Sequence, residues 1–186
     1  MTTLPSVNTI ADGTAVKTPG SNIFPYIKKN LDDIITVEDD ELIVAFLDMV
    51  ENHKMIVENS GLLTVAALKH LGVKDKRVVS ILSGGNMDVI TMSSVVQQGL
   101  IFRDRIFTVS VLLPDKPGEL AKVSQTLADV QGNVIKLEHN QFVTTNRSAA
   151  VELRITLECF GTEHKEQIIA ALEKKGYKPR IVRTMI

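Results

Sequence analysis

The chain has 186 residues, of which 44% are hydrophobic and 23% charged, enough for one large domain or two small ones with buried cores. Its net charge of −1 gives no electrostatic reason to expect a nucleic acid or an anionic membrane as partner. The single cysteine, Cys159, excludes an internal disulfide, and no Cys or His cluster has the spacing of metal ligands. Because we find neither a signal peptide nor a long apolar run, we expect a cytoplasmic protein.

Helices and strands alternate over residues 23–98. Apolar residues at helical spacing predict helices at 23–31, 39–53, 62–71 and 88–98. Asp39 or Asp40 is a suitable N-cap for the second of these helices, and Ser60 for the third. Apolar or β-branched runs between the helices predict strands at 34–37, 55–57 and 77–82. This alternation favours a parallel sheet, so we expect residues 1–104 to be part of an α/β domain.

The pattern changes after residue 104, where we place a domain boundary. Alternating side chains predict a half-buried strand at 106–113 and a one-sided strand at 149–157 whose other face meets solvent or a partner chain. Further strands are expected at 134–137 and 181–182, and a hairpin at 140–147. Two helices complete the unit, one starting near Leu120 and one capped by Thr162. The order βαββαβ predicts a ferredoxin-like sandwich over residues 105–186.

Three short polar segments stand out in the first part of the chain. They are Ala11-Asp12-Gly13, Glu58-Asn59-Ser60-Gly61 and Ser83-Gly84-Gly85-Asn86. In an open parallel sheet, ligands bind outside the carboxyl ends of the strands, and both Glu58 and Ser83 follow predicted strands. The two residues are therefore candidates for one site. The alternative is that the glycines only permit tight turns and that Glu58 only complements a helix dipole.

Four longer stretches carry a resemblance to a known family. In order they read TIADGTAVKTPG, DDIITVEDDEL, VENSGLLTVAALKHL and VVSILSGGNMDV. Together they resemble the carboxy-terminal part of the threonine dehydratases and serine racemases of pyridoxal-phosphate fold type II. The resemblance implies that Ser83 places its hydroxyl against the pyridine nitrogen of pyridoxal phosphate. It also implies that Glu58 lies beside the ring near the substrate and that Gly13 brings backbone close to the ring.

Two elements that this resemblance requires are missing. No lysine of the chain, whether Lys17, Lys54 or Lys69, has the sequence context of the family's Schiff-base lysine, and the glycine-rich phosphate loop is absent. We therefore assign no catalytic residue and expect the isolated chain neither to bind pyridoxal phosphate nor to dehydrate threonine. Met1 is interpreted as the start of a truncated gene product, unless a separate chain supplies the amino-terminal catalytic part.

Residues 105–186 resemble an ACT domain, with Leu113-Pro114-Asp115-Lys116-Pro117-Gly118-Glu119-Leu120 as its signature turn. The resemblance implies self-association and an amino-acid effector, for which isoleucine or valine is suitable. Free amides at a helix start can bind a carboxylate, and Asp115 or Asn133 can meet an ammonium group. The candidate effector residues are Asp115, Lys116, Gly118, Glu119, Leu120 and Asn133. The alternative is that the turn only starts a helix and that the domain only dimerises.

The sequence thus favours the carboxy-terminal part of a pyridoxal-phosphate-dependent threonine dehydratase, a lyase that converts threonine to 2-oxobutanoate and ammonia. In this interpretation the chain senses an amino acid and self-associates through its ACT domain. Two alternatives remain open. One is a stand-alone amino-acid-binding regulatory or scaffold protein, and the other is one half of a split enzyme.

Overall fold

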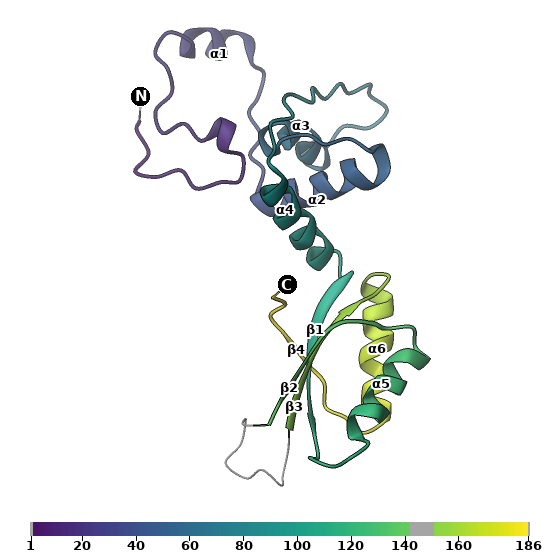
Figure 1. The fold of residues 1–186 in the computed structure, drawn as a ribbon. Helices are drawn as coiled ribbons and strands as arrows, with labels where there is room; N and C mark the ends of the chain where they lie inside the picture. Colours follow the sequence, from purple (N-terminus) through teal and green to yellow (C-terminus); the bar gives the residue numbers. More distant parts are fainter. Residues whose placement is uncertain (1, 142–150, 186) are drawn as a thin grey trace. The chain divides into compact units, whose positions relative to one another are not determined.

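The computed structural model describes residues 2–141 and 151–185, and it divides into two compact units (Figure 1). Unit 1 comprises Met1–Gly99 and unit 2 comprises Leu100–Ile186. Most of the hairpin predicted at 140–147 lies outside the described residues. Within the described ranges, no helix combines the length and the apolar character that crossing a membrane would require.

Unit 1 consists of short helices joined by irregular chain. Its elements are η1 (Asp12–Thr14), α1 (Phe24–Asn30), α2 (Asp39–Asp48), η2 (Met49–His53), η3 (Asn59–Leu62), α3 (Leu63–Ala66), η4 (Ala67–His70) and α4 (Val89–Phe102). Of the η elements, η2 is a π-helical extension of α2 and the others are 3₁₀ turns. The helices predicted at 23–31, 39–53 and 88–98 are confirmed, whereas the one predicted at 62–71 is broken into α3 and its two 3₁₀ neighbours.

The strands predicted at 34–37, 55–57 and 77–82 are wrong. The structure describes no strand among residues 2–105, so the parallel sheet expected in residues 1–104 is absent from the described chain. A strand persists only when a neighbour satisfies its backbone groups, and these segments find no such neighbour in the described residues. Several of their apolar side chains remain exposed, such as Val79 at 88% and Ile81 at 70%, whereas Val57 at 3% belongs to the core of unit 1.

The core of unit 1 is gathered around α2. Leu42 and Phe46, four residues apart on one face of α2, are 1% and 0% exposed. Leu62 of η3, Val95 of α4 and Ala11 of the opening loop belong to the same buried cluster. Burial of these side chains stabilises the contact of the opening loop, η3 and α4 with α2, although the segments are far apart in the sequence.

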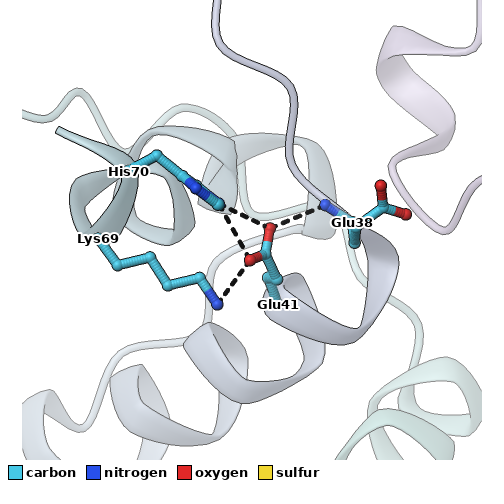
Figure 2. A network of polar contacts seen from close by, with 4 residues as sticks. All are labelled: Glu38, Glu41, Lys69 and His70. Carbon is cyan, nitrogen blue, oxygen red and sulfur yellow. Dashed lines mark hydrogen bonds and ion pairs between the residues drawn. The ribbon is translucent and has the colours of Figure 1, made fainter.

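Glu41 joins the first turn of α2 to η4 (Figure 2). Glu38 is the N-cap, and its backbone amide donates to the Glu41 carboxylate at 2.9 Å in a capping box. The same carboxylate lies 2.6 Å from Lys69 Nζ and 3.0 Å from His70 Nε2. The Lys69 ammonium, the Glu38 amide and the His70 ring together lower the pKa of Glu41 from 4.5 to about 2. Glu41 is therefore ionised over the whole neutral range.

Two side chains predicted as helix caps bind other parts of the chain instead. Glu38 caps α2, not Asp39 or Asp40, and the Asp39 carboxylate accepts hydrogen bonds from the loop at residues 9–10. Ser60 lies inside η3, and its Oγ accepts a hydrogen bond from the Gly13 amide at 2.9 Å. Both polar groups therefore hold the opening loop against α2 and η3.

Unit 2 is a four-stranded antiparallel sheet covered on one face by two helices (Figure 1). Its elements are β1 (Ile106–Leu113), α5 (Glu119–Asp129), β2 (Asn133–Asn140), β3 (Val151–Glu158), α6 (Thr162–Lys174) and β4 (Arg180–Val182). The strand order is β2-β3-β1-β4. This arrangement confirms the predicted βαββαβ ferredoxin-like fold.

The two faces of the sheet in unit 2 differ in chemistry. Every second residue of β1 and β3 packs against α5 and α6, and Val109 and Ile155 are fully buried there. The opposite face, predicted to meet solvent or a partner chain, is partly buried within the chain itself, with Ser110 and Thr156 among its buried residues. Ser110 Oγ donates to Glu152 Oε1 at 2.7 Å, and the pKa of Glu152 is lowered by this hydroxyl and by the Arg154 guanidinium. Paired polar side chains therefore cover the middle of that face.

Asp104 anchors the segment that precedes β1. Its carboxylate lies 2.6 Å from Lys165 Nζ and accepts a hydrogen bond from Thr162 Oγ1 at 2.8 Å. Thr162 was expected to cap α6, but Gly161 is the N-cap and no side chain caps this helix. The Lys165 ammonium and the Thr162 hydroxyl lower the pKa of Asp104. Asp104 thus connects the chain before β1 to the first turn of α6.

Leu153 tests the core of unit 2, because its side chain is fully buried in β3. Leu153→Ala should lower the free energy of unfolding by about 2–5 kcal/mol, since it leaves a cavity in the core. Leu112→Ala is the matched control, because Leu112 is 49% exposed, and it should cost less than about 1 kcal/mol. Urea unfolding of the full chain, followed by circular dichroism, measures both, and equal losses would contradict the assignment of the core.

Glu41 provides a test of the contact between α2 and η4. Because its folded pKa is lowered, ionised Glu41 contributes stability that is present above pH 4.5 and is lost as the pH falls toward about 2. Glu41→Gln should therefore destabilise the chain at neutral pH, and its difference from the wild type should disappear at low pH. Asp40→Asn, in the same helical turn, should show a smaller effect at neutral pH. Denaturation curves at several pH values measure this, and a pH-independent difference would contradict the network.

Candidate functional site

The three polar segments singled out in the sequence converge in unit 1. The Gly13 amide donates to Ser60 Oγ at 2.9 Å, and a side-chain carbon added at Gly13 would lie 3.9 Å from Glu58 Oε1. From the other side, the Asn86 amide donates to Glu58 Oε2 at 3.1 Å. The Glu58 carboxylate therefore lies between the opening loop and the turn at 83–86.

Two glycines allow this close approach. Gly84 has φ +80°, and a side-chain carbon there would lie 2.3 Å from the Glu58 carboxyl carbon. At Gly61 the added carbon would lie 1.9 Å from the Ser83 carbonyl oxygen. The backbone of Ser83 is thus packed against the start of η3, while the Ser83 residue itself is exposed. The structure brings Gly13, Glu58 and Ser83 into one polar cluster.

A cavity of about 440 Å³ borders this cluster inside unit 1. Its polar walls include Asp12, Glu58, Asn59, Asn86 and Asp88, and the described residues that line it include neither lysine nor arginine. The pKa of Asp88 is lowered by hydrogen bonds from the Thr91 hydroxyl and from amides in the first turn of α4. The site is therefore acidic, with acceptors rather than cationic groups in its walls.

The residues predicted to bind an effector are divided between the two ends of unit 2. The turn at 114–118 follows Leu113, which pairs with Val151, whereas Asn133 pairs with Glu158 at the other end of β3. Seven residue steps along a strand correspond to roughly 23 Å. Asn133 Nδ2 donates to Glu158 Oε2 at 3.0 Å. One copy of the chain therefore does not bring Asn133 together with the turn.

The turn itself is open at the start of α5. Gly118 has φ +90° and is the N-cap, no side chain caps the helix, and a side-chain carbon at Gly118 would meet no atom within 4 Å. Asp115, Lys116 and Leu120 are exposed. Glu119 is bound to Lys122 at 2.7 Å, and its carboxylate raises the pKa of the Lys122 ammonium. Backbone amides at the start of α5 are therefore open to solvent, because no side chain caps this helix.

His164 and Cys159 have structural surroundings. His164 Nδ1 accepts from the Phe160 amide at 3.1 Å, so Nε2 carries the hydrogen that it donates to the Val130 carbonyl at 2.6 Å. Burial raises the pKa of the Cys159 thiol, which disfavours the reactive thiolate. No group of three or more His, Cys, Asp and Glu side chains is arranged to hold a metal ion anywhere in the described ranges.

Sequence reasoning found the segments of the cluster but missed one of its side chains. Asn59 is 6% exposed, and its Nδ2 donates to the Ile10 carbonyl at 3.1 Å. An asparagine beside a helix start usually suggests a cap, which hid its role in the wall of a cavity. The one feature of the sequence that points to Asn59 is its position next to Glu58, in a polar segment already identified as a candidate for the site.

Gly61 tests the packing of the cluster. Gly61→Ala should displace the Ser83 carbonyl and destabilise unit 1 by about 1–3 kcal/mol, because the new carbon overlaps backbone that must move. Gly72→Ala is the matched control, since nothing lies within 4 Å of its added carbon, and it should change stability by less than about 1 kcal/mol. Thermal unfolding, with amide exchange at residues 83–86 as a local readout, measures both. Equal destabilisation by the two substitutions would contradict the close contact between Gly61 and the Ser83 carbonyl.

Comparisons with known families divide the chain in a similar way. The family model described as pyridoxal-phosphate dependent enzyme matches residues 1–84, and the model described as ACT domain matches residues 107–176.

Curated relatives match nearly the whole chain. An L-threonine ammonia-lyase of Geobacter sulfurreducens is 37% identical over 176 residues, and one of Thermotoga maritima is 34% identical over 175 residues. Each alignment covers 94% of this chain but only 44% of the relative, so the chain spans less than half the length of these proteins. The solved structure of a processed threonine deaminase isoform 2 from Solanum lycopersicum is 29% identical, covering 52% of this chain and 29% of that one, with a TM-score of 0.48. Residues 1–84 therefore belong to the pyridoxal-phosphate dependent enzyme family, and residues 107–176 form an ACT domain.

Proposed function

We propose that this chain is the carboxy-terminal part of a pyridoxal-phosphate-dependent threonine ammonia-lyase, the enzyme that converts threonine to 2-oxobutanoate and ammonia. The observation that carries the proposal is the combination of the two family matches with threonine ammonia-lyase relatives aligned over 94% of the chain. In this function, residues 1–104 supply one side of the catalytic site and residues 105–186 regulate it.

The Glu58 cluster fits one side of the cofactor. Ser83 would present its hydroxyl to the ring nitrogen, Gly13 would allow backbone close to the ring, and Glu58 would lie near the substrate. Pyridoxal phosphate supplies an electron sink when bound. A neutral hydroxyl at its nitrogen would not force protonation of the ring and would moderate that sink. Among the described residues, no lysine or arginine lines the cavity, so the Schiff-base and phosphate contacts must come from elsewhere, and the isolated chain should be inactive.

The ACT domain gives the chain a regulatory role. The uncapped start of α5 can bind the carboxylate of an amino acid such as isoleucine or valine, and Gly118 leaves room for it. Because Asn133 lies at the opposite end of the same unit, an effector that contacts both must bind between two copies. A two-fold pairing of the domains places the turn end of one copy beside the Asn133 end of the other. Effector binding and self-association are therefore coupled.

Two other functions make different predictions. A stand-alone amino-acid-binding protein would bind its effector but would not form 2-oxobutanoate with any partner chain. One half of a split enzyme would form 2-oxobutanoate from threonine when mixed with pyridoxal phosphate and a separate amino-terminal chain. The second outcome would also support the threonine ammonia-lyase assignment.

Calorimetric titration with isoleucine, valine, threonine and serine tests the regulatory role, with light scattering as the measure of mass. We expect one branched-chain amino acid to bind and to stabilise the dimer. Gly118→Leu should abolish binding, because its side chain would fill the approach to α5. Gly176→Leu is the matched control, since Gly176 also has positive φ and open space around it. A stable dimer that binds none of the four amino acids would contradict effector sensing and would leave the ACT domain as an assembly element.

A further inference from the structure

The open face of the sheet in unit 2 carries a row of side chains that crosses all four strands. Thr108 of β1 lies opposite Thr156 of β3 and opposite Val182 of β4, and Thr156 lies opposite Lys136 of β2. Directly opposite residues of an antiparallel sheet project their side chains to the same face. Because α5 and α6 pack against the other face, these four side chains lie on the open one.

A cavity of about 290 Å³ borders this row. Thr108 and Thr156 line it and are 6% and 5% exposed, so they form its buried part. The charged side chains of the lining are Lys136, Glu138, Arg154 and Arg183. Three cationic groups and one carboxylate thus surround two hydroxyl groups. This cavity has the opposite electrostatic character to the acidic one in unit 1.

The two arginines provide the positive charge that a ligand can use. Lys136 Nζ lies 2.8 Å from Glu138 Oε1, so these two charges offset each other. Arg154 Nε lies 3.1 Å from Glu152 Oε2, but a guanidinium carries five N–H donors and can bind a second acceptor. Arg183, which follows β4, forms no ion pair with any residue that the structure describes.

The hydroxyl groups of Thr108 and Thr156 contain a donor without an acceptor. Their Oγ1 atoms lie 3.0 Å apart, so one hydroxyl donates to the other. Two hydroxyl groups carry two hydrogens, and this bond uses one of them. Neither hydroxyl has another partner in the described part of the chain. A buried donor without an acceptor costs free energy, which an oxygen atom of a ligand in the cavity would recover.

We propose that this cavity binds a phosphate group, either free or as the monoester of a small molecule. Its oxygens accept from the guanidinium groups of Arg154 and Arg183 and from the unused hydroxyl hydrogen of the threonine pair. Phosphate carries about −1.5 to −2 charges at neutral pH, which suits two arginines better than the single charge of a carboxylate does. The site is separate from the effector site proposed at the start of α5, and it does not depend on the assignment to a threonine ammonia-lyase.

Titration of the full chain with inorganic phosphate tests the proposal, with the nuclear magnetic resonance signals of Thr108 and Thr156 as the readout. At neutral pH and low ionic strength we expect saturable shifts and a dissociation constant on the order of millimolar. Acetate should bind at least about tenfold more weakly, because it brings one charge and two oxygens. Methyl phosphate distinguishes the two sources: affinity equal to that of phosphate indicates a monoester, and weaker binding indicates free phosphate. Phosphate that leaves both signals unchanged, or acetate that binds as tightly, would overturn the proposal.

Two arginines on the same side of the molecule locate the ligand. Arg183→Gln should weaken phosphate binding by at least about fivefold, because it removes a guanidinium from the lining. Arg180→Gln is the matched control, since Arg180 is also exposed but lies outside the lining, and it should change the affinity by less than about twofold. Equal losses in the two variants would show attraction to the general positive charge of the surface and would refute the site.

Two further variants test the roles of the other groups. Glu138→Gln should tighten phosphate binding several-fold, because it removes the carboxylate from the lining and frees Lys136. The double substitution Thr108→Val and Thr156→Val removes both hydroxyl partners together, which should keep the chain folded and weaken binding several-fold. Unchanged affinity in both would rule out the proposed contacts. Gly118→Leu, which tests the amino-acid effector, should leave phosphate binding unchanged, so the two proposals fail independently.

Discussion

Pairing between β1 and β3 is the contact on which unit 2 depends. Eight residues of each strand lie in register, from Ile106 opposite Glu158 to Leu113 opposite Val151, so each strand satisfies the backbone of the other. The pairing also brings the buried residues of both strands onto one face, where α5 and α6 cover them. The polar residues on the other face then pair across the same strands. Strand pairing thus determines both the core and the chemistry of the sheet surface.

Unit 1 satisfies much of its backbone in another way, through side chains. Asp39, Ser60 and Glu58 accept hydrogen bonds from loop amides, and Asn59 donates to a loop carbonyl. Each of these contacts joins segments that are distant in the sequence. Because acceptors are needed to bind amides, carboxylates gather where the loops meet. The acidic character of the cavity follows from the way in which the loops are held.

The fold of unit 2 could be predicted because its signals are local. Period-two alternation in 106–113 and 149–157, and the glycines that end the helices, determine the elements and their order. In unit 1 the same reasoning correctly placed most helices, whose hydrogen bonds lie within one segment. It failed for 77–82, because a strand requires a partner that an apolar pattern does not guarantee.

The candidate site could be predicted in part for the same reason. Gly13, Glu58 and Ser83, to which the resemblance assigns roles around one cofactor, lie in segments that contact one another in the structure. The place of Asn59 in the cavity wall depends on which atoms surround the amide, and no sequence pattern contains that information. The separation of Asn133 from Gly118 was equally hidden, because it follows from strand register across the sheet and not from distance along the chain.

Strand β2 lies at an edge of the sheet, and all of its residues are exposed. Its Lys136 and Glu138 point to the same side, with Nζ 2.8 Å from Oε1. If two copies join along this edge in antiparallel fashion, a two-fold axis at Leu137 places Lys136 of each copy opposite Glu138 of the other. An axis moved by one residue in either direction places lysine opposite lysine or glutamate opposite glutamate. These two charges therefore select a single alignment for the joined sheets and disfavour its nearest competitors.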